Sequence, residues 1–183
     1  LFLVNVSRNF ALPISCRSWR CDVCAVERGR AVHLLFERGI AAAKSRGERV
    51  RFITLTDGAA GTMSVAELSA AWNRLRTTLK REGKLKEYAA CVEPQRRGAL
   101  HLHVLCTGEF VAQRQLRHWA EQAGWGSHVD IRIVRDKGAA GYSSKLAAYA
   151  AKANEVAEAM SRKGAKRVRP IRVRRGWLPG GLR

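Results

Sequence analysis

The chain has 183 residues, 46% of them hydrophobic, so it has enough apolar side chains for a buried core and is not a disordered basic tail. Its 34 Lys and Arg residues outnumber 15 Asp and Glu residues, and the net charge of +19 predicts binding to a polyanion such as DNA or RNA. No apolar stretch approaches the roughly 20 residues that a membrane span needs, and the first residues do not have the pattern of a signal peptide.

Three cysteines lie close together near the start of the chain, at Cys16, Cys21 and Cys24. With a fourth ligand they would form a tetrahedral structural zinc site. His33 is the nearest candidate, Cys91 and Cys106 are more distant, and the choice stays open. The alternative is ordinary thiols in a reducing cytoplasm, because five cysteines are an odd number and do not suit a secreted disulfide framework.

Residues 1–25 are expected to be irregular, and the apolar spacing over 26–44 predicts a helix. Four later segments, rich in β-branched and aromatic residues, are predicted strands: 50–56, 87–93, 99–107 and 128–134. Helices are predicted between them over 64–81 and 111–123, and Ser64 with Glu67 forms a capping-box signature at the start of the first. This order is that of an α+β, ferredoxin-like (βαββαβ) fold, with an antiparallel sheet, two helices on one face and the other face free.

A long Ala-rich helix is predicted over 138–162, near or across the free face, and an irregular basic tail over 163–183. The chain therefore divides into a Cys-rich segment with its helix (1–45), a catalytic domain (46–162) and the tail. Because the chain begins at Leu1 and not at Met, we expect it to be a fragment of a longer protein.

Two histidines alternate with apolar residues in the strand over 99–107. His101 and His103 would lie side by side on the free face, about 7 Å apart along the strand. The preceding strand ends at Glu93, which would lie beside His101 across the hairpin. Two imidazoles and a carboxylate suit Mg²⁺ or Mn²⁺, with water and phosphate in the remaining positions. The alternative is two surface histidines, with Glu93 paired to Arg96 or Arg97 in the hairpin loop.

The predicted helix over 138–162 carries two tyrosines and two lysines on one side. Tyr142, Lys145, Tyr149 and Lys152 fall within an arc of about 80° at 100° per residue. An aromatic stripe of this kind often packs into a core, but two lysines in the same arc argue against burial. A phenol beside ammonium groups is instead a candidate nucleophile, since the positive charge favours phenolate and attracts phosphate.

Together these segments resemble the HUH endonucleases, specifically the rolling-circle replication initiators of plasmids and phages. The resemblance covers about residues 50–152: Phe52 to Thr56 resembles the first motif, His101 to Leu105 the His-hydrophobic-His motif, and Leu146 to Lys152 the tyrosine motif. Glu93 is similar to the third metal ligand of viral initiators. Many phage initiators have a second tyrosine four residues after the first, whereas position 153 here is Ala.

The resemblance implies that Tyr149, assisted by Lys152, attacks a phosphate of single-stranded origin DNA held at a Mg²⁺ or Mn²⁺ ion. The product would be a 5′-phosphotyrosine link and a free 3′-hydroxyl, and reversal would rejoin the strands. Tyr142, with Lys145 three residues on, remains a rival or second nucleophile. No phosphate-binding helicase loop is present. A host helicase and polymerase in a bacterial cytoplasm are therefore the expected partners.

Basic residues outside the motifs are expected to bind DNA phosphates without reading sequence. Those nearest the predicted site are Arg96 and Arg97, and the tail adds Arg167 and Arg169. Trp125 and Trp177 are candidates for stacking on bases, with packing as the alternative. Two other functions stay open: a non-catalytic zinc-dependent nucleic-acid-binding protein, and an HUH transposase or relaxase. Relaxases usually have three clustered histidines, and here two stand together.

Overall fold

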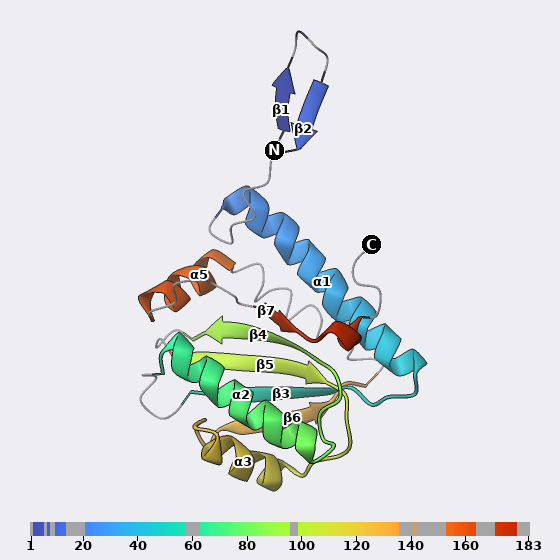
Figure 1. The fold of residues 1–183 in the computed structure, drawn as a ribbon, viewed down its shortest axis with the longest axis vertical. Coiled ribbons are helices and arrows are strands. Elements are labelled where there is room, and N and C mark those ends of the chain that lie inside the picture. Colours follow the sequence, from blue (N-terminus) through green and yellow to red (C-terminus); the bar gives the residue numbers. More distant parts are fainter. Residues whose placement is uncertain are drawn as a thin grey trace.

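The computed structural model of the protein describes residues 2–5, 7, 10–13, 21–57, 63–95, 99–135, 141, 153–163 and 171–178. Within them a five-stranded antiparallel sheet has the strand order β6-β3-β5-β4-β7 (Figure 1). The strands are β3 (Arg51–Thr56), β4 (Tyr88–Pro94), β5 (Leu100–Cys106), β6 (Val129–Ile133) and β7 (Ile171–Val173). The first four, with two intervening helices, form the predicted ferredoxin-like α+β fold.

These two helices, α2 (Val65–Arg81) and α3 (Gln113–Gln122), cover one face of the sheet (Figure 1). The predicted capping box begins α2: Ser64 Oγ accepts from the Glu67 amide at 3.2 Å, and the Glu67 carboxylate accepts from the Ser64 amide at 2.7 Å. Leu100, Leu102 and Val104 point from β5 into the core beneath these helices. Alternation along β5 therefore places His101 and His103 on the opposite face.

The opposite face is not free, which corrects the prediction from sequence. Helix α1 (Asp22–Ser45) packs Phe36 and Ile40 in a second core with Phe52 and Leu105 of the sheet. The helix predicted over 26–44 thus exists, but it is part of the sheet's packing. Half of this face is closed by α1, and the other half carries the two histidines.

The C-terminal residues are also more ordered than an irregular tail. Strand β7 pairs with β4, and the 3₁₀ turn η2 (Arg175–Trp177) follows it. Trp177 is fully buried in the second core, and its Nε1–H donates to the Leu35 carbonyl at 3.2 Å. Gly39 permits this contact, because a Cβ there would lie 2.0 Å from the indole nitrogen. Trp177 is therefore a packing residue and not a stacking platform, and Trp125 is buried as well.

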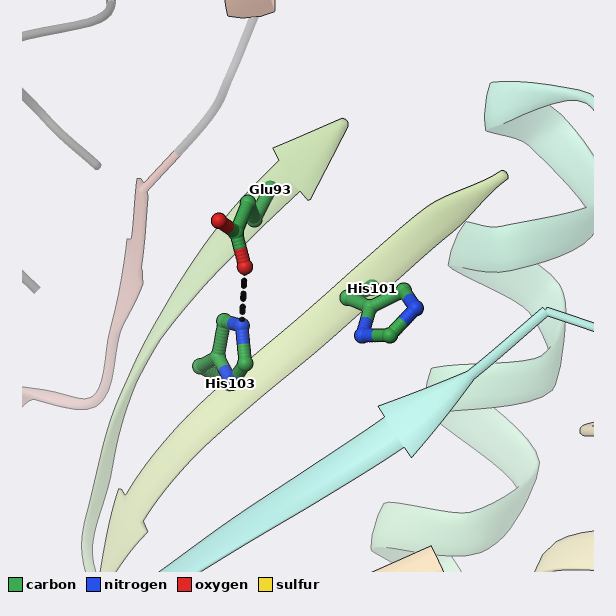
Figure 2. A group of neighbouring side chains, drawn as sticks. All are labelled: Glu93, His101 and His103. Carbon is green, nitrogen blue, oxygen red and sulfur yellow. Dashed lines mark hydrogen bonds and ion pairs between the residues drawn. The ribbon is translucent and has the colours of Figure 1, made fainter. Parts of the chain in front are cut away.

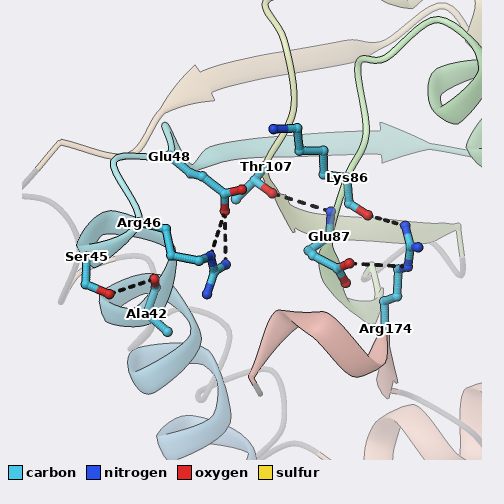
Figure 3. Close-up of polar contacts among 8 residues, drawn as sticks. All are labelled: Ala42, Ser45, Arg46, Glu48, Lys86, Glu87, Thr107 and Arg174. Atoms are coloured by element: carbon cyan, nitrogen blue, oxygen red, sulfur yellow. Dashed lines mark hydrogen bonds and ion pairs between the residues drawn. The ribbon is translucent and has the colours of Figure 1, made fainter.

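Arg174 fastens the same segment to the start of β4 (Figure 3). Its guanidinium donates to the Lys86 carbonyl and lies 3.4 Å from Glu87 Oε1. The Glu87 amide in turn donates to Thr107 Oγ1 at 3.4 Å. A side-chain and backbone network thus ties the C-terminal segment to the sheet beside the turn of Trp177.

Two further elements complete the described structure. Helix α5 (Ala153–Arg162) is the C-terminal part of the helix predicted over 138–162. Strands β1 (Phe2–Asn5) and β2 (Phe10–Pro13) form an antiparallel hairpin within the segment expected to be irregular. None of the helices described here has the length and apolar character needed to cross a membrane.

Candidate metal centre

Glu93, His101 and His103 converge as the sequence predicts (Figure 2). One ligand atom from each residue lies within 4.8 Å of the others. The pairing of β4 with β5 sets Glu93 directly opposite His101, and the rings of His101 and His103 have centroids 6.0 Å apart. The three donors therefore share one face and can reach a single ion.

Glu93 pairs with the more distant histidine of the two in register. Its Oε2 lies 2.7 Å from His103 Nε2, while Thr54 Oγ1 lies 3.1 Å from His103 Nδ1. The His103 ring also stacks on Phe52, with centroids 5.4 Å apart and a 17° angle between the planes. These contacts fix the ring, so that Nε2 points at the carboxylate and Nδ1 at the hydroxyl.

His101 has a different environment. Its buried Nε2 has no hydrogen-bond partner among the described residues. Burial lowers the pKa of His101, the neighbouring His103 lowers it further, and Glu93 and Asp57 act in the opposite direction. The imidazole is therefore held in the neutral form, which is the form that binds metals.

This donor set fits a divalent metal ion. An orphaned buried nitrogen beside a second imidazole and a carboxylate is costly without a partner and is satisfied by coordination. Three protein ligands leave coordination positions for water or a phosphate oxygen. With an ion at His103 Nε2, the ring hydrogen would be on Nδ1, and Thr54 Oγ1 would accept it as the outer hydrogen bond that orients the ligand.

The sequence analysis assigned no role to Thr54 or Asp57. Thr54 is the register partner of His103, and this pairing was within reach of the alternation pattern in β3. Asp57 is buried at the end of β3; its Oδ2 accepts from the Met63 amide at 3.1 Å and lies 3.8 Å from Lys163 Nζ. Lys163 follows α5, so this contact joins the C-terminal helix to the loop near His101.

Most of the other predicted site residues lie outside the described residues. They are Cys16, Arg96, Arg97, Tyr142, Lys145, Tyr149, Lys152, Arg167 and Arg169. The positions of the nucleophile and of the DNA-binding arginines therefore stay predictions.

The zinc prediction is narrowed by α1. Cys21 precedes the helix and Cys24 lies in its first turn, both as free thiols. His33 stands nine residues beyond Cys24 on the same helix, about 13.5 Å along its axis, which is too far to share an ion. Cys91 and Cys106 are buried in the sheet, where burial raises the pKa of each thiol to about 12. None of these three is placed to complete the site.

The fold and this centre define an α+β protein with a histidine–carboxylate metal site on a ferredoxin-like sheet. Residues 50–154 match the family of replication-associated proteins of the ORF2 type, and the chain belongs to this family. The matched segment runs from the start of β3 to the beginning of α5, so it contains the whole cluster. No curated protein and no solved structure matches the chain significantly. Family membership supports a role in replication initiation, with origin DNA as the partner.

Proposed function

We propose that the protein is an HUH-type initiator of rolling-circle replication that nicks and rejoins single-stranded origin DNA. The observation that carries this proposal is the convergence of Glu93, His101 and His103 within the segment that matches the replication-associated family. The third group of the cluster is a carboxylate, which favours an initiator over a relaxase with three histidines. The proposed metal is Mg²⁺ or Mn²⁺.

Each residue of the centre has a definite task in this proposal. When bound, the metal would polarise the scissile phosphate and offset its developing charge. Glu93, His101 and His103 hold the ion at the sheet, and Thr54 keeps the His103 ring in the coordinating tautomer. Phe52 limits rotation of the same ring by stacking on it. The described residues thus supply a rigid electrophilic site.

The nucleophile is proposed to be Tyr149, with Tyr142 as rival or second nucleophile. The phenol gives up its proton, its oxygen bonds to phosphorus, and the bond from phosphorus to the 3′-oxygen breaks; that oxygen takes up a proton to become the free 3′-hydroxyl. The ammonium groups of Lys152 and Lys145 favour the phenolate. The contacts of Lys163 with Asp57 and Met63 support this arrangement, because they hold the end of the C-terminal helix near β3.

The test is formation of a covalent adduct. The protein is incubated with Mn²⁺ and single-stranded oligonucleotides tiled across the replicon that encodes it, and adducts are separated under denaturing conditions. We expect an adduct with one oligonucleotide, lost with EDTA, with His103→Ala and with Tyr149→Phe. Loss with Tyr142→Phe instead would move the nucleophile to Tyr142. An adduct that survives both tyrosine variants, or no adduct on any oligonucleotide, contradicts the proposal.

A further inference from the structure

A second polar site lies on the opposite face of the sheet from the metal centre. It is a pocket of about 510 Å³ between α2, β4, β7 and the end of α5. Ala90 of β4 faces the core under α2, and its partner in β7 is Arg172. The register therefore turns Arg172 toward α2, away from the face of His101 and His103.

Two arginines line this pocket from different elements. Arg172 Nη2 donates to Ser69 Oγ at 2.7 Å, and Arg76 Nη1 donates to the Tyr88 hydroxyl at 3.0 Å. Ser69 and Arg76 are two turns apart on one side of α2, about 10.5 Å along its axis. No residue in the described lining is acidic, and no carboxylate of the described chain pairs with Arg76. The pocket thus gathers positive charge and hydrogen-bond donors without a counter-charge of its own.

The remaining walls are apolar and aromatic. Trp72 meets Tyr88 edge to face, with ring centroids 5.2 Å apart, and Val65 and Met160 line the pocket beside them. The volume is within the range of about 300–1,000 Å³ that is typical of small-ligand sites. Guanidinium groups match phosphate oxygens, whereas aromatic and aliphatic walls suit a base or a sugar.

We propose that this pocket binds a nucleotide unit, with its phosphate held by Arg76 and Arg172 and its base or sugar against the Trp72 wall. The same chemistry is offered by a DNA strand and by a free nucleotide. Because binding here needs no metal and no tyrosine, the inference stands whether or not the protein nicks DNA.

Fluorescence anisotropy with a labelled single-stranded oligonucleotide in EDTA tests the proposal. Arg76→Gln and Arg172→Gln are compared with Arg117→Gln, which removes the same charge from an exposed position on α3. We expect each pocket variant to weaken binding about tenfold more than the control and to reduce the salt dependence by ~0.7 per lost phosphate contact. Equal losses in all three variants would show a general charge effect and overturn the proposal.

A competition arm distinguishes the two sources of the nucleotide. If dTMP displaces the oligonucleotide from the wild-type protein but not from the pocket variants, the pocket accepts a free nucleotide. If dTMP does not compete while oligonucleotide binding depends on Arg76 and Arg172, the ligand is the DNA strand.

Chemical protection of the wild-type protein keeps the test valid if a variant does not fold. Phenylglyoxal modifies accessible guanidinium groups, and peptide mass mapping reports each arginine separately. We expect the oligonucleotide or dTMP to protect Arg76 and Arg172 and to leave Arg117 reactive. Unchanged modification of Arg76 and Arg172 under saturating ligand would exclude binding in this pocket.

Discussion

The two faces of β5 are made by the same seven residues and do different work. On one face Leu100, Leu102 and Val104 are fully buried under α2 and α3. On the other, His101 and His103 are only 9% and 5% exposed, yet they lie beside a carboxylate and one nitrogen has no partner among the described residues. Burial is thus similar on both faces, and what separates them is whether the buried atoms are satisfied.

This contrast separates a core from a site. Apolar side chains gain stability from burial, whereas a buried imidazole without a partner loses it. The face of the histidines therefore costs the fold something, and α1 with Trp177 compensates by closing the other half of that face. Substitutions on the two faces should accordingly differ in kind: some change stability and others change metal affinity.

The largest expected effect on stability is at Trp177. Trp177→Ala removes a fully buried ring from between Gly39 and the sheet, and we expect the free energy of unfolding to fall by about 3–5 kcal/mol. Urea denaturation measures the change, with exposed Arg117→Gln as the control. A loss below about 1 kcal/mol would mean that the C-terminal segment does not close the second core.

On the helix-covered face, Leu102→Ala should cost about 2–5 kcal/mol through the cavity that it leaves. Leu102→Met conserves most of the volume and should cost less than about 1.5 kcal/mol. Both variants, measured under conditions where they remain folded, should bind Mn²⁺ as the wild type does. A change in Mn²⁺ affinity as large as that from a ligand substitution would break the distinction between the two faces.

Thr54→Val tests the outer contact of the centre. The substitution keeps the shape but removes the hydroxyl that contacts His103 Nδ1, and we expect Mn²⁺ affinity to fall about 10- to 100-fold. Thr56→Val, one pleat along β3 and without a hydrogen bond to either histidine in the described structure, is the matched control. Isothermal titration calorimetry should separate the two variants, and equal affinities would remove Thr54 from the account.

The smallest expected effect is a pH dependence of stability that comes from Cys91. Burial, together with the nearby Glu93, raises the pKa of this thiol to about 12 in the folded protein. Between its ordinary value and about 12, the unfolded chain has lost the thiol proton and the folded chain keeps it. Stability is therefore full below the ordinary thiol pKa and falls as the pH rises, by about 1.4 kcal/mol per pH unit for this group.

Comparison of the wild type with Cys91→Ala isolates this contribution. Unfolding free energies are measured by denaturant at pH 8 and pH 10, and the wild type should lose more stability than the variant over that interval. Parallel pH profiles for the two proteins would show that the thiol is not buried as described.

The sequence predicts the sheet and the metal cluster well because both follow from local alternation. A period of two in β5 is enough to separate Leu102 from His103, and a short hairpin brings Glu93 alongside. The role of Thr54 needs the pairing of β3 with β5, which joins segments almost fifty residues apart. That pairing is set by tertiary packing and is not visible in either strand alone.

The covering of the second face was missed for a related reason. The apolar stripe of α1 predicts a helix but not the surface that it covers. Trp177 stands among basic residues that suggest a solvated tail, and only its insertion beside Gly39 shows that it belongs to the core. Long-range packing partners of this kind are not encoded in local periodicity.

The central claim is that Glu93, His101 and His103 hold one divalent metal ion on the face of the sheet opposite α2. Calorimetric titration of Mn²⁺ into the wild-type protein and into His101→Ala tests it most directly. We expect one equivalent to bind to the wild type and binding to be lost in the variant, whose circular dichroism remains that of a folded α+β protein. Equal binding by both proteins, or none by the wild type, would contradict the claim.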